Sequence, residues 1–193
     1  MAIARPDALA LLETRRTIAF QEFAEPGPSE EELRRIVACA VRVPDHGKLT
    51  PWRFVVVRGD ARAALDERLF ALWQARFPDA PEGKRAQEKT RFAAAPLTIL
   101  VISTAAEHVK IPLWEQELSA GAASMNLMLA AHAFGYAAQW LTTWIAYDRD
   151  ALAVLGVKPE ERLAALIPIG TPTVAPVERP RPAYEAVVTE WKA

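Results

Sequence analysis

The segment from Leu113 to Phe134 constrains the fold more than any other part of the chain. It contains no proline, and no Asp, Glu, Lys or Arg follows Glu117 within it. A helix at the surface would carry charged residues along one face, so this pattern is typical of a helix that is buried on most sides. We therefore predict a central helix that other layers of structure cover.

Two apolar segments predict strands in the interior of a sheet. Trp52–Val57 and Pro96–Thr104 are rich in β-branched and aromatic residues, and a turn signal at Gly59-Asp60 follows the first. Strands alternating with helical segments in this order predict an α+β or α/β architecture around one sheet.

The remaining pattern divides into shorter elements and a tail. Helices are expected at Pro6 to Arg15–Arg16, from Ser29 to just before Pro44, at 60–77, at 84–94 and at Arg149–Leu155. Further strands are expected around Tyr136–Leu141 and at Leu163–Ile169, the second closed by Gly170. We expect a single domain over 1–193, in which residues from about 172 to 193 form a proline-rich C-terminal arm.

Composition excludes several classes of protein. The chain of 193 residues is 51% apolar and 24% charged, with a formal net charge of -1, so no excess of positive charge recruits nucleic acid or a membrane surface. No apolar run approaches the ~18 residues of a membrane span, and Arg5, Pro6 and Asp7 interrupt the N-terminal segment too early for a signal peptide. We expect a cytoplasmic protein without a nucleic-acid or membrane partner.

Cysteine and histidine give no metal site. The single cysteine, Cys39, excludes an internal disulfide, and its apolar setting IVACAV predicts a buried structural thiol. His46, His108 and His132 lie far apart and match no ligand pattern. His132 falls on an apolar helical stripe, which favours a histidine whose hydrogen bonds are satisfied, and His108 is expected at the surface.

Phosphate binding, if present, must use side chains. The eight glycines are never closer than twelve positions, so neither a dinucleotide fingerprint nor a phosphate loop occurs. The candidates are Arg15-Arg16 with Thr17, and Arg179 with Arg181, because guanidinium groups bind phosphate in a bidentate manner. The alternatives remain open: a basic cap on the first helix and a solvated polar tail.

His46 differs from the other histidines because Pro44 and Gly47 place it in a loop directly before a strand. Functional groups often gather in such loops. The same segment, RVPDHGKLTPWRFVVV at 42–57, belongs to a wider resemblance. Together with ALALLETRRT at 8–17, KIPLWEQELSAGAASMNLMLAAHAFGYAAQW at 110–140 and IPIGTP at 167–172, it resembles the FMN-dependent nitroreductase family, and most closely the subgroup of small NAD(P)H nitroreductases with a PDHxxxQPW-type motif.

The resemblance implies an α+β homodimer with a mostly antiparallel central sheet flanked by helices, an extended C-terminal arm, and FMN at the subunit interface. It implies that one group of residues contacts the FMN of its own subunit: Arg15, Arg16, Thr17, Trp140, Leu141 and Thr142, with Arg179 and Arg181 on the phosphate. Arg42 and His46 are expected to reach the FMN held mainly by the partner subunit. NAD(P)H is assigned to the segment Ala130, Ala131, His132, Ala133, Phe134 and Gly135.

The implied reaction passes hydride from NAD(P)H through flavin N5 to a nitroaromatic, a quinone or a similar electron-poor acceptor, without a catalytic side chain. Ala19 stands where many larger members have a lysine, and Lys48 and Thr50 replace an asparagine and a glutamine; Lys48 is a hypothetical substitute for the missing charge.

Two alternatives stay open: a non-catalytic flavin-binding or flavin-storage homodimer, and a helical-interface protein whose basic residues are structural. The acceptor and the choice between NADH and NADPH are not determined by the sequence.

Overall fold

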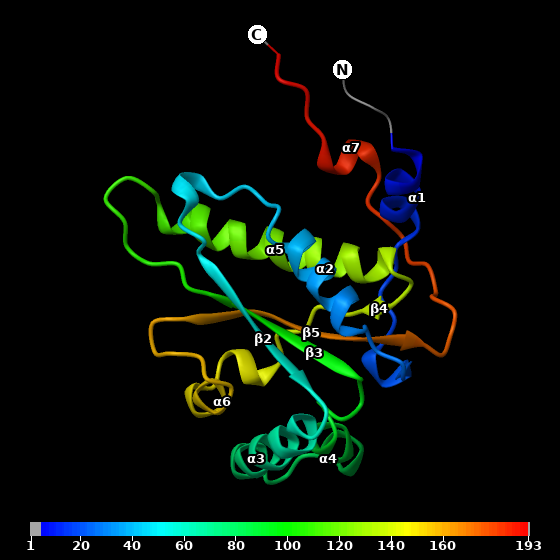
Figure 1. Cartoon of the computed structure of the whole chain (residues 1–193), viewed down its shortest axis with the longest axis vertical. Coiled ribbons are helices and arrows are strands. Elements are labelled where there is room, and N and C mark those ends of the chain that lie inside the picture. The colour runs from blue at the N-terminus through cyan, green and yellow to red at the C-terminus, as the bar shows by residue number, and fades with distance from the viewer. Residues whose placement is uncertain (1–4, 193) are drawn as a thin grey trace.

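A computed structural model describes residues 5–192 and shows one sheet with helices on both sides (Figure 1). Every pairing between its described strands is antiparallel. The strand order is β1-β5-β3-β2, and β4 pairs with β5 off this path. The strands are β1 (Phe23–Ala24), β2 (Trp52–Arg58), β3 (Leu97–Ser103), β4 (Ala137–Ala138) and β5 (Arg162–Pro172). The predicted α+β class with a mostly antiparallel sheet is confirmed.

Strand β3 lies at the centre of the sheet, and all of its residues are buried. Its neighbours are β2 on one side, where Phe54 pairs with Val101, and β5 on the other, where Ile167 pairs with Ile99. A strand with structure on both faces cannot alternate polar and apolar residues, which explains the continuous apolar run of the sequence.

Two helices cover one face of the sheet (Figure 1): α2 (Glu30–Ala40) and the central α5 (Leu113–Ala133). Helix α2 begins at a capping box, in which Ser29 and Glu32 exchange side-chain and backbone hydrogen bonds. Leu33 and Ile36 of α2 and Leu127 of α5 are buried in one cluster with the inward residues of β3 and β5. The predicted central helix is thus present, and it backs the sheet.

The opposite side of the sheet carries α3 (Ala61–Arg76), α4 (Glu82–Lys89) and α6 (Arg149–Val154) (Figure 1). Apolar residues of α3 and α6 form a second core with Leu100, Ile102 and Leu166 of the sheet. Helix α1 (Pro6–Thr14) lies beside the C-terminal end of α5, near the short α7 (Tyr184–Val187) of the tail. Within the described residues, no helix is long and apolar enough to cross a bilayer.

The predicted limits of three elements are wrong. Strand β5 does not close at Gly170 but continues to Pro172, because Gly170 lets Phe23 and Pro96 pack against the strand: a Cβ there would lie 2.9 and 2.7 Å from their side chains. Of the strand expected at 136–141, only Ala137–Ala138 forms a strand, β4, and Leu141 pairs with Leu166 in a separate β-bridge. The helix expected over 84–94 ends at Lys89.

The early end of α4 has a local cause. The buried carboxylate of Asp66 on α3 accepts hydrogen bonds of 2.8 Å from the backbone N–H groups of Phe92 and Ala93. These bonds hold the chain in a turn before β3. Burial raises the pKa of Asp66, and the two backbone donors oppose that rise.

The prediction of a buried Cys39 is also wrong, because its side chain is exposed. Helix α2 buries Leu33, Ile36 and Ala40, which follow the helical spacing of three and four. Cys39 lies one position off this stripe. The run IVACAV has apolar residues on both faces, so its composition did not reveal which face is inside.

Candidate functional site

Arginines from the two ends of the chain converge on one carboxylate, that of Glu178. Nε of Arg16 lies 3.6 Å from Oε1 of Glu178, and an NH group of Arg181 lies 3.2 Å from the same oxygen. The backbone N–H of Arg179 donates to it at 2.7 Å. The backbone of Arg179, followed by the charges of Arg181 and Arg16, lowers the pKa of Glu178. The structure therefore brings together the two arginine pairs that the sequence placed more than 160 positions apart.

Strand pairing explains this convergence. The chain after Arg16 passes through a short 3-10 helix, Phe20–Glu22, into β1, which pairs with the end of β5. Just beyond β5, Thr173 donates both its backbone N–H, at 2.9 Å, and its hydroxyl, at 3.0 Å, to the carbonyl of Glu22. The arm therefore starts beside the Arg15–Thr17 segment.

The hydrogen-bond donors of the Arg16 guanidinium are only partly satisfied by the described residues. Its side chain is 17% exposed, and among residues 5–192 its buried Nε has no hydrogen-bond partner, because 3.6 Å to Glu178 is too long for one. Arg15 and Thr17 are half-buried beside it. A half-buried guanidinium with unused donors, next to a carboxylate that is 65% exposed, is suited to an anion with more oxygens than Glu178 has.

His132 lies at the C-terminal end of α5, close to Arg15. Burial, and then the charge of Arg15, lower its pKa to about 4, so the imidazole is neutral at pH 7. Its buried Nε2 has no hydrogen-bond partner in the part of the chain that the structure describes, so the prediction of a satisfied histidine is wrong there. Of its neighbours, Ala130 and Ala131 lie in the core and Phe134 packs under Arg35, while Ala133 and Gly135 are exposed. The assignment of this segment to NAD(P)H stays a prediction.

Hydrogen bonds to the backbone of β5 hold the segment Trp140–Thr142 in place. Nε1 of Trp140 donates to the carbonyl of Ala164 at 3.1 Å, and Leu141 exchanges two backbone hydrogen bonds with Leu166. The residue just before the segment, Gln139, accepts the backbone N–H of Phe20 at 2.9 Å. The structure therefore places Trp140–Thr142 against the chain that leaves Arg15–Thr17.

The loop before β2 is built rigidly. The carboxylate of Asp45 accepts the backbone N–H groups of Leu49 and Thr50, both at 3.0 Å. Lys48 and Thr50 have φ values of 57° and 50°, a conformation that costs a non-glycine residue about 1 kcal/mol or more. Gly47 has a φ of 70°, and a Cβ at this position would lie 2.4 Å from Ile111. Strain of this kind persists only where the surrounding contacts impose it, and it concentrates at functional sites.

This loop presents His46 to the first turn of α5. Nδ1 of His46 lies 2.7 Å from Oε2 of Glu115, and both side chains are largely exposed. Two consecutive hydrogen bonds fix the loop behind these side chains. Nε1 of Trp52 donates to Oγ of Ser119, and Ser119 donates to the carbonyl of Pro44. His46 borders a pocket of about 340 Å³ that Leu118 and Ala122 also line. Arg42 is exposed, as is Lys48.

Within one chain, the predicted residues form two separate groups. Glu115 and His46 lie at the first turn of α5, whereas His132 and Arg15 lie at its last turn. Seventeen residues of helix separate these ends by roughly 25 Å. His46 is thus not brought to the arginine site of its own chain, and Arg42 lies between the two groups, where Asn126 of α5 donates to its carbonyl at 3.1 Å. The sequence did not single out Glu178, Glu115 or Gln139 as members of these groups, because no motif marks them.

Comparisons with known proteins agree with this architecture. The model of the "Nitroreductase family" matches residues 12–171. The "Putative NAD(P)H nitroreductase YdjA" of Escherichia coli (strain K12) is 34% identical over 168 residues, which cover 86% of this chain and 88% of that protein. A "putative nitroreductase in complex with fmn" from Desulfovibrio desulfuricans is 25% identical, with a TM-score of 0.73 over 99% of this chain and 100% of the other.

A second structure supports the fold alone. The nitroreductase-like family protein of Bacillus cereus has a TM-score of 0.82 with 18% identity, and each chain is covered completely. The family model spans most of the chain, including Arg15–Thr17, the His46 loop, α5 and β5. The chain therefore belongs to the nitroreductase family.

Proposed function

We propose that this protein is an FMN-dependent NAD(P)H oxidoreductase that reduces nitroaromatics, quinones or similar electron-poor acceptors. The observation that carries the proposal is the convergence of Arg16, Arg179 and Arg181 on Glu178. A phosphate monoester carries up to two negative charges and three acceptor oxygens. It therefore fits these donors better than a single exposed carboxylate does. The related Desulfovibrio desulfuricans structure contains FMN, and YdjA is named an NAD(P)H nitroreductase.

The chain's own residues hold and shield the cofactor in this proposal. Arg15, Arg16 and Thr17 bind the phosphate and ribityl end, and the arm brings Arg179 and Arg181 to the same phosphate. Trp140–Thr142, fixed on β5 by its backbone, forms one wall for the ring. When bound, FMN supplies the hydride-transfer chemistry. The protein need supply no acid or base; it orients the ring and limits its access to water.

The same geometry supports a homodimer. His46 and Arg15 lie at opposite ends of α5, so two copies with antiparallel α5 helices would bring the His46 loop of one to the arginine site of the other. Large apolar side chains are also exposed on the elements near these ends, as a subunit interface requires: Leu9, Leu12, Trp114, Leu118, Tyr184, Val187 and Trp191.

Anaerobic spectroscopy tests the function. The purified chain is expected to be yellow, and NADH or NADPH is expected to bleach the flavin absorbance, since hydride transfer to oxidised flavin removes its visible band. Addition of a quinone should restore the band. A yellow protein that neither nucleotide bleaches would be a flavin-binding or flavin-storage dimer, and a colourless chain that does not take up FMN would make the basic residues structural.

His46→Ala is expected to weaken FMN retention without unfolding the protein. Its side chain is 63% exposed and, within residues 5–192, hydrogen-bonds only Glu115, so its loss leaves the core intact. Loss of one contact to the cofactor should raise the FMN dissociation constant about tenfold, as measured by fluorescence titration of the apoprotein. Lys110→Ala, which removes another exposed cation from the neighbouring loop, is the control. Unaltered retention in His46→Ala would remove His46 from the site.

A further inference from the structure

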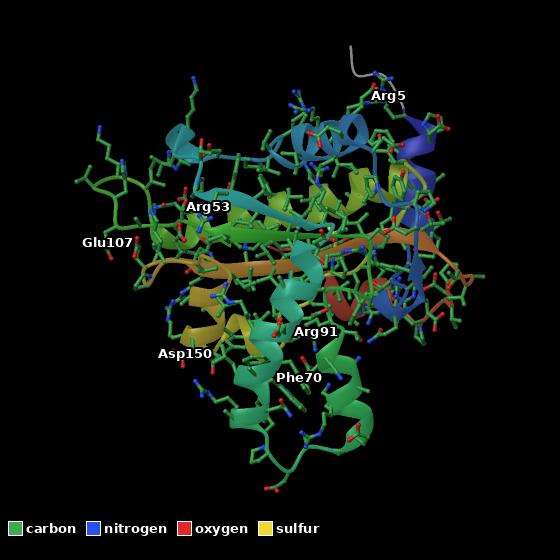
Figure 2. The ribbon with its side chains drawn as sticks, turned by 60° about the horizontal axis from the view of Figure 1, so that its bottom comes forward. Arg5, Arg53, Phe70, Arg91, Glu107 and Asp150 are labelled. Carbon is green, nitrogen blue, oxygen red and sulfur yellow. The ribbon has the colours of Figure 1, made fainter. Side chains whose placement is uncertain are left out.

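A buried ion pair lies between the α3–α4 hairpin and the sheet, where Figure 2 labels Arg91. Nε of Arg91 donates to Oε2 of Glu88 at 2.9 Å, and a second, parallel contact joins the guanidinium to Oε1. The side chains of Arg91 and Glu88 are only 5% and 3% exposed. Nothing in the proposed function uses this pair.

The pair contacts one residue that follows each of the two segments that the proposed function assigns to FMN. Nε1 of Trp144 donates to Oε2 of Glu88 at 3.1 Å, and Trp144 follows Thr142 by two positions. The guanidinium of Arg91 lies over the ring of Phe20, 5.8 Å from its centroid, and Phe20 follows Thr17 by three. One residue of the pair therefore holds the chain after Trp140–Thr142, and the other holds the chain after Arg15–Thr17.

The hydrogen bond to Glu88 adds to the packing of Trp144. The indole packs against the second core and lies edge-on to Phe77, and it also borders a cavity of about 310 Å³ that Trp73, Thr143 and Lys84 line. Fewer atoms restrict the indole on the side of the cavity, so the hydrogen bond to Glu88 contributes to its orientation.

A buried ion pair is by itself weak evidence for a role in stability. A buried ion pair loses so much hydration that apolar residues of similar volume often replace it without loss, or with a gain, in stability. What such a pair does supply is a defined geometry, because its charges and hydrogen bonds are satisfied in only one arrangement.

We propose that Glu88 and Arg91 are positioning residues, which fix Trp140–Thr142 relative to Arg15–Thr17 and so set the affinity and reduction potential of the flavin. The inference rests on the proposed function. The side chain of Gln139 already joins the two segments, because its Oε1 accepts the backbone N–H of Phe20 at 2.9 Å. The ion pair adds a second connection, from Phe20 through Arg91 and Glu88 to Trp144, and so restricts rotation about the first.

Two variants test the proposal in the full-length protein. Trp144→Phe keeps an aromatic ring and removes only the donor to Glu88. Glu88→Leu with Arg91→Met removes both charges together and leaves no unpaired buried ion. Trp73→Phe is the matched control, because Trp73 is buried at the same cavity but, within the described chain, makes no hydrogen bond to Glu88.

The measurements are the FMN dissociation constant of the apoprotein, the visible circular dichroism of bound FMN, and its midpoint potential. Trp144→Phe and the double variant are expected to raise the dissociation constant about tenfold, to weaken the flavin dichroism and to shift the potential. Trp73→Phe is expected to match the wild type in all three. Urea unfolding of each apoprotein separates these effects from general destabilisation.

Two results would overturn the inference while leaving the proposed function intact: folded variants with wild-type affinity and potential, or a Trp73→Phe control with the same losses as Trp144→Phe. The second result would assign the effect to packing of the cavity. A wild-type chain that binds no FMN would overturn the proposed function, and the inference with it, before any variant is compared.

Discussion

Arg16→Ala is expected to lose most of its affinity for FMN, with a dissociation constant about a hundredfold higher than that of the wild type. Arg16 is the least exposed of the arginines that converge on Glu178, and its Nε is buried without a partner. A charge-assisted hydrogen bond to phosphate in such a setting contributes about 1.5–3 kcal/mol, more than a contact from the exposed arm does.

Fluorescence titration of the apoprotein with FMN measures this effect. Arg16→Lys should fall between the wild type and the alanine variant, because lysine keeps the charge but not the planar fork of donors. Arg34→Ala is the control, since Arg34 is 77% exposed and its one ion pair among the described residues is with Glu30 on the same helix. An alanine variant that binds FMN as tightly as Arg34→Ala does would place the phosphate elsewhere.

Glu161→Gln is expected to destabilise the protein by about 3 kcal/mol at pH 7. The carboxylate of Glu161 is buried and accepts two hydrogen bonds from Arg53, at 2.8 and 2.6 Å, with a third from the backbone of Lys158 at 2.9 Å. The hydrogen bond from Arg53 is the main cause that lowers the pKa of Glu161 to about 2, against the opposing effect of burial.

The pH dependence of this effect follows from the sign of the shift. A carboxyl whose pKa is lower in the folded chain than in the unfolded chain stabilises the fold above the unfolded value, 4.5. That contribution is lost as pH falls from about 4.5 to about 2. The difference between wild type and Glu161→Gln should therefore shrink towards zero over this range.

Urea unfolding of the apoprotein, at fixed protein concentration and several pH values, measures the difference. Glu117→Gln is the matched control: its partner Arg162 is 75% exposed and 3.4 Å away, so its loss should cost less than about 1 kcal/mol at any pH. A pH-independent difference between wild type and Glu161→Gln would show that geometry, not the ionised pair, stabilises this end of β5.

Local patterns predicted most of the secondary structure. The uncharged, proline-free segment became α5, and the two β-branched runs became β2 and β3 with limits shifted by one residue. Errors arose where the deciding contact is distant in sequence. Gly170 was taken as the end of a strand, but the approach of Pro96 and Phe23 makes it part of β5. Cys39 was assigned to the interior because its neighbours are apolar on both faces of α2.

The candidate site shows the same division. The sequence by itself determined that any phosphate must be held by arginines, since no glycine loop exists, and the residues of its motifs pointed to the family that the comparisons confirm. Only the tertiary structure decided that Arg16 and the Arg179–Arg181 segment lie against the same carboxylate, that of Glu178. It also decided that Glu88 and Arg91 connect Trp144 with Phe20. The physical reason is that sheet pairing and burial place residues far apart along the chain within a few ångströms, whereas helical and strand periodicity carries information only about near neighbours.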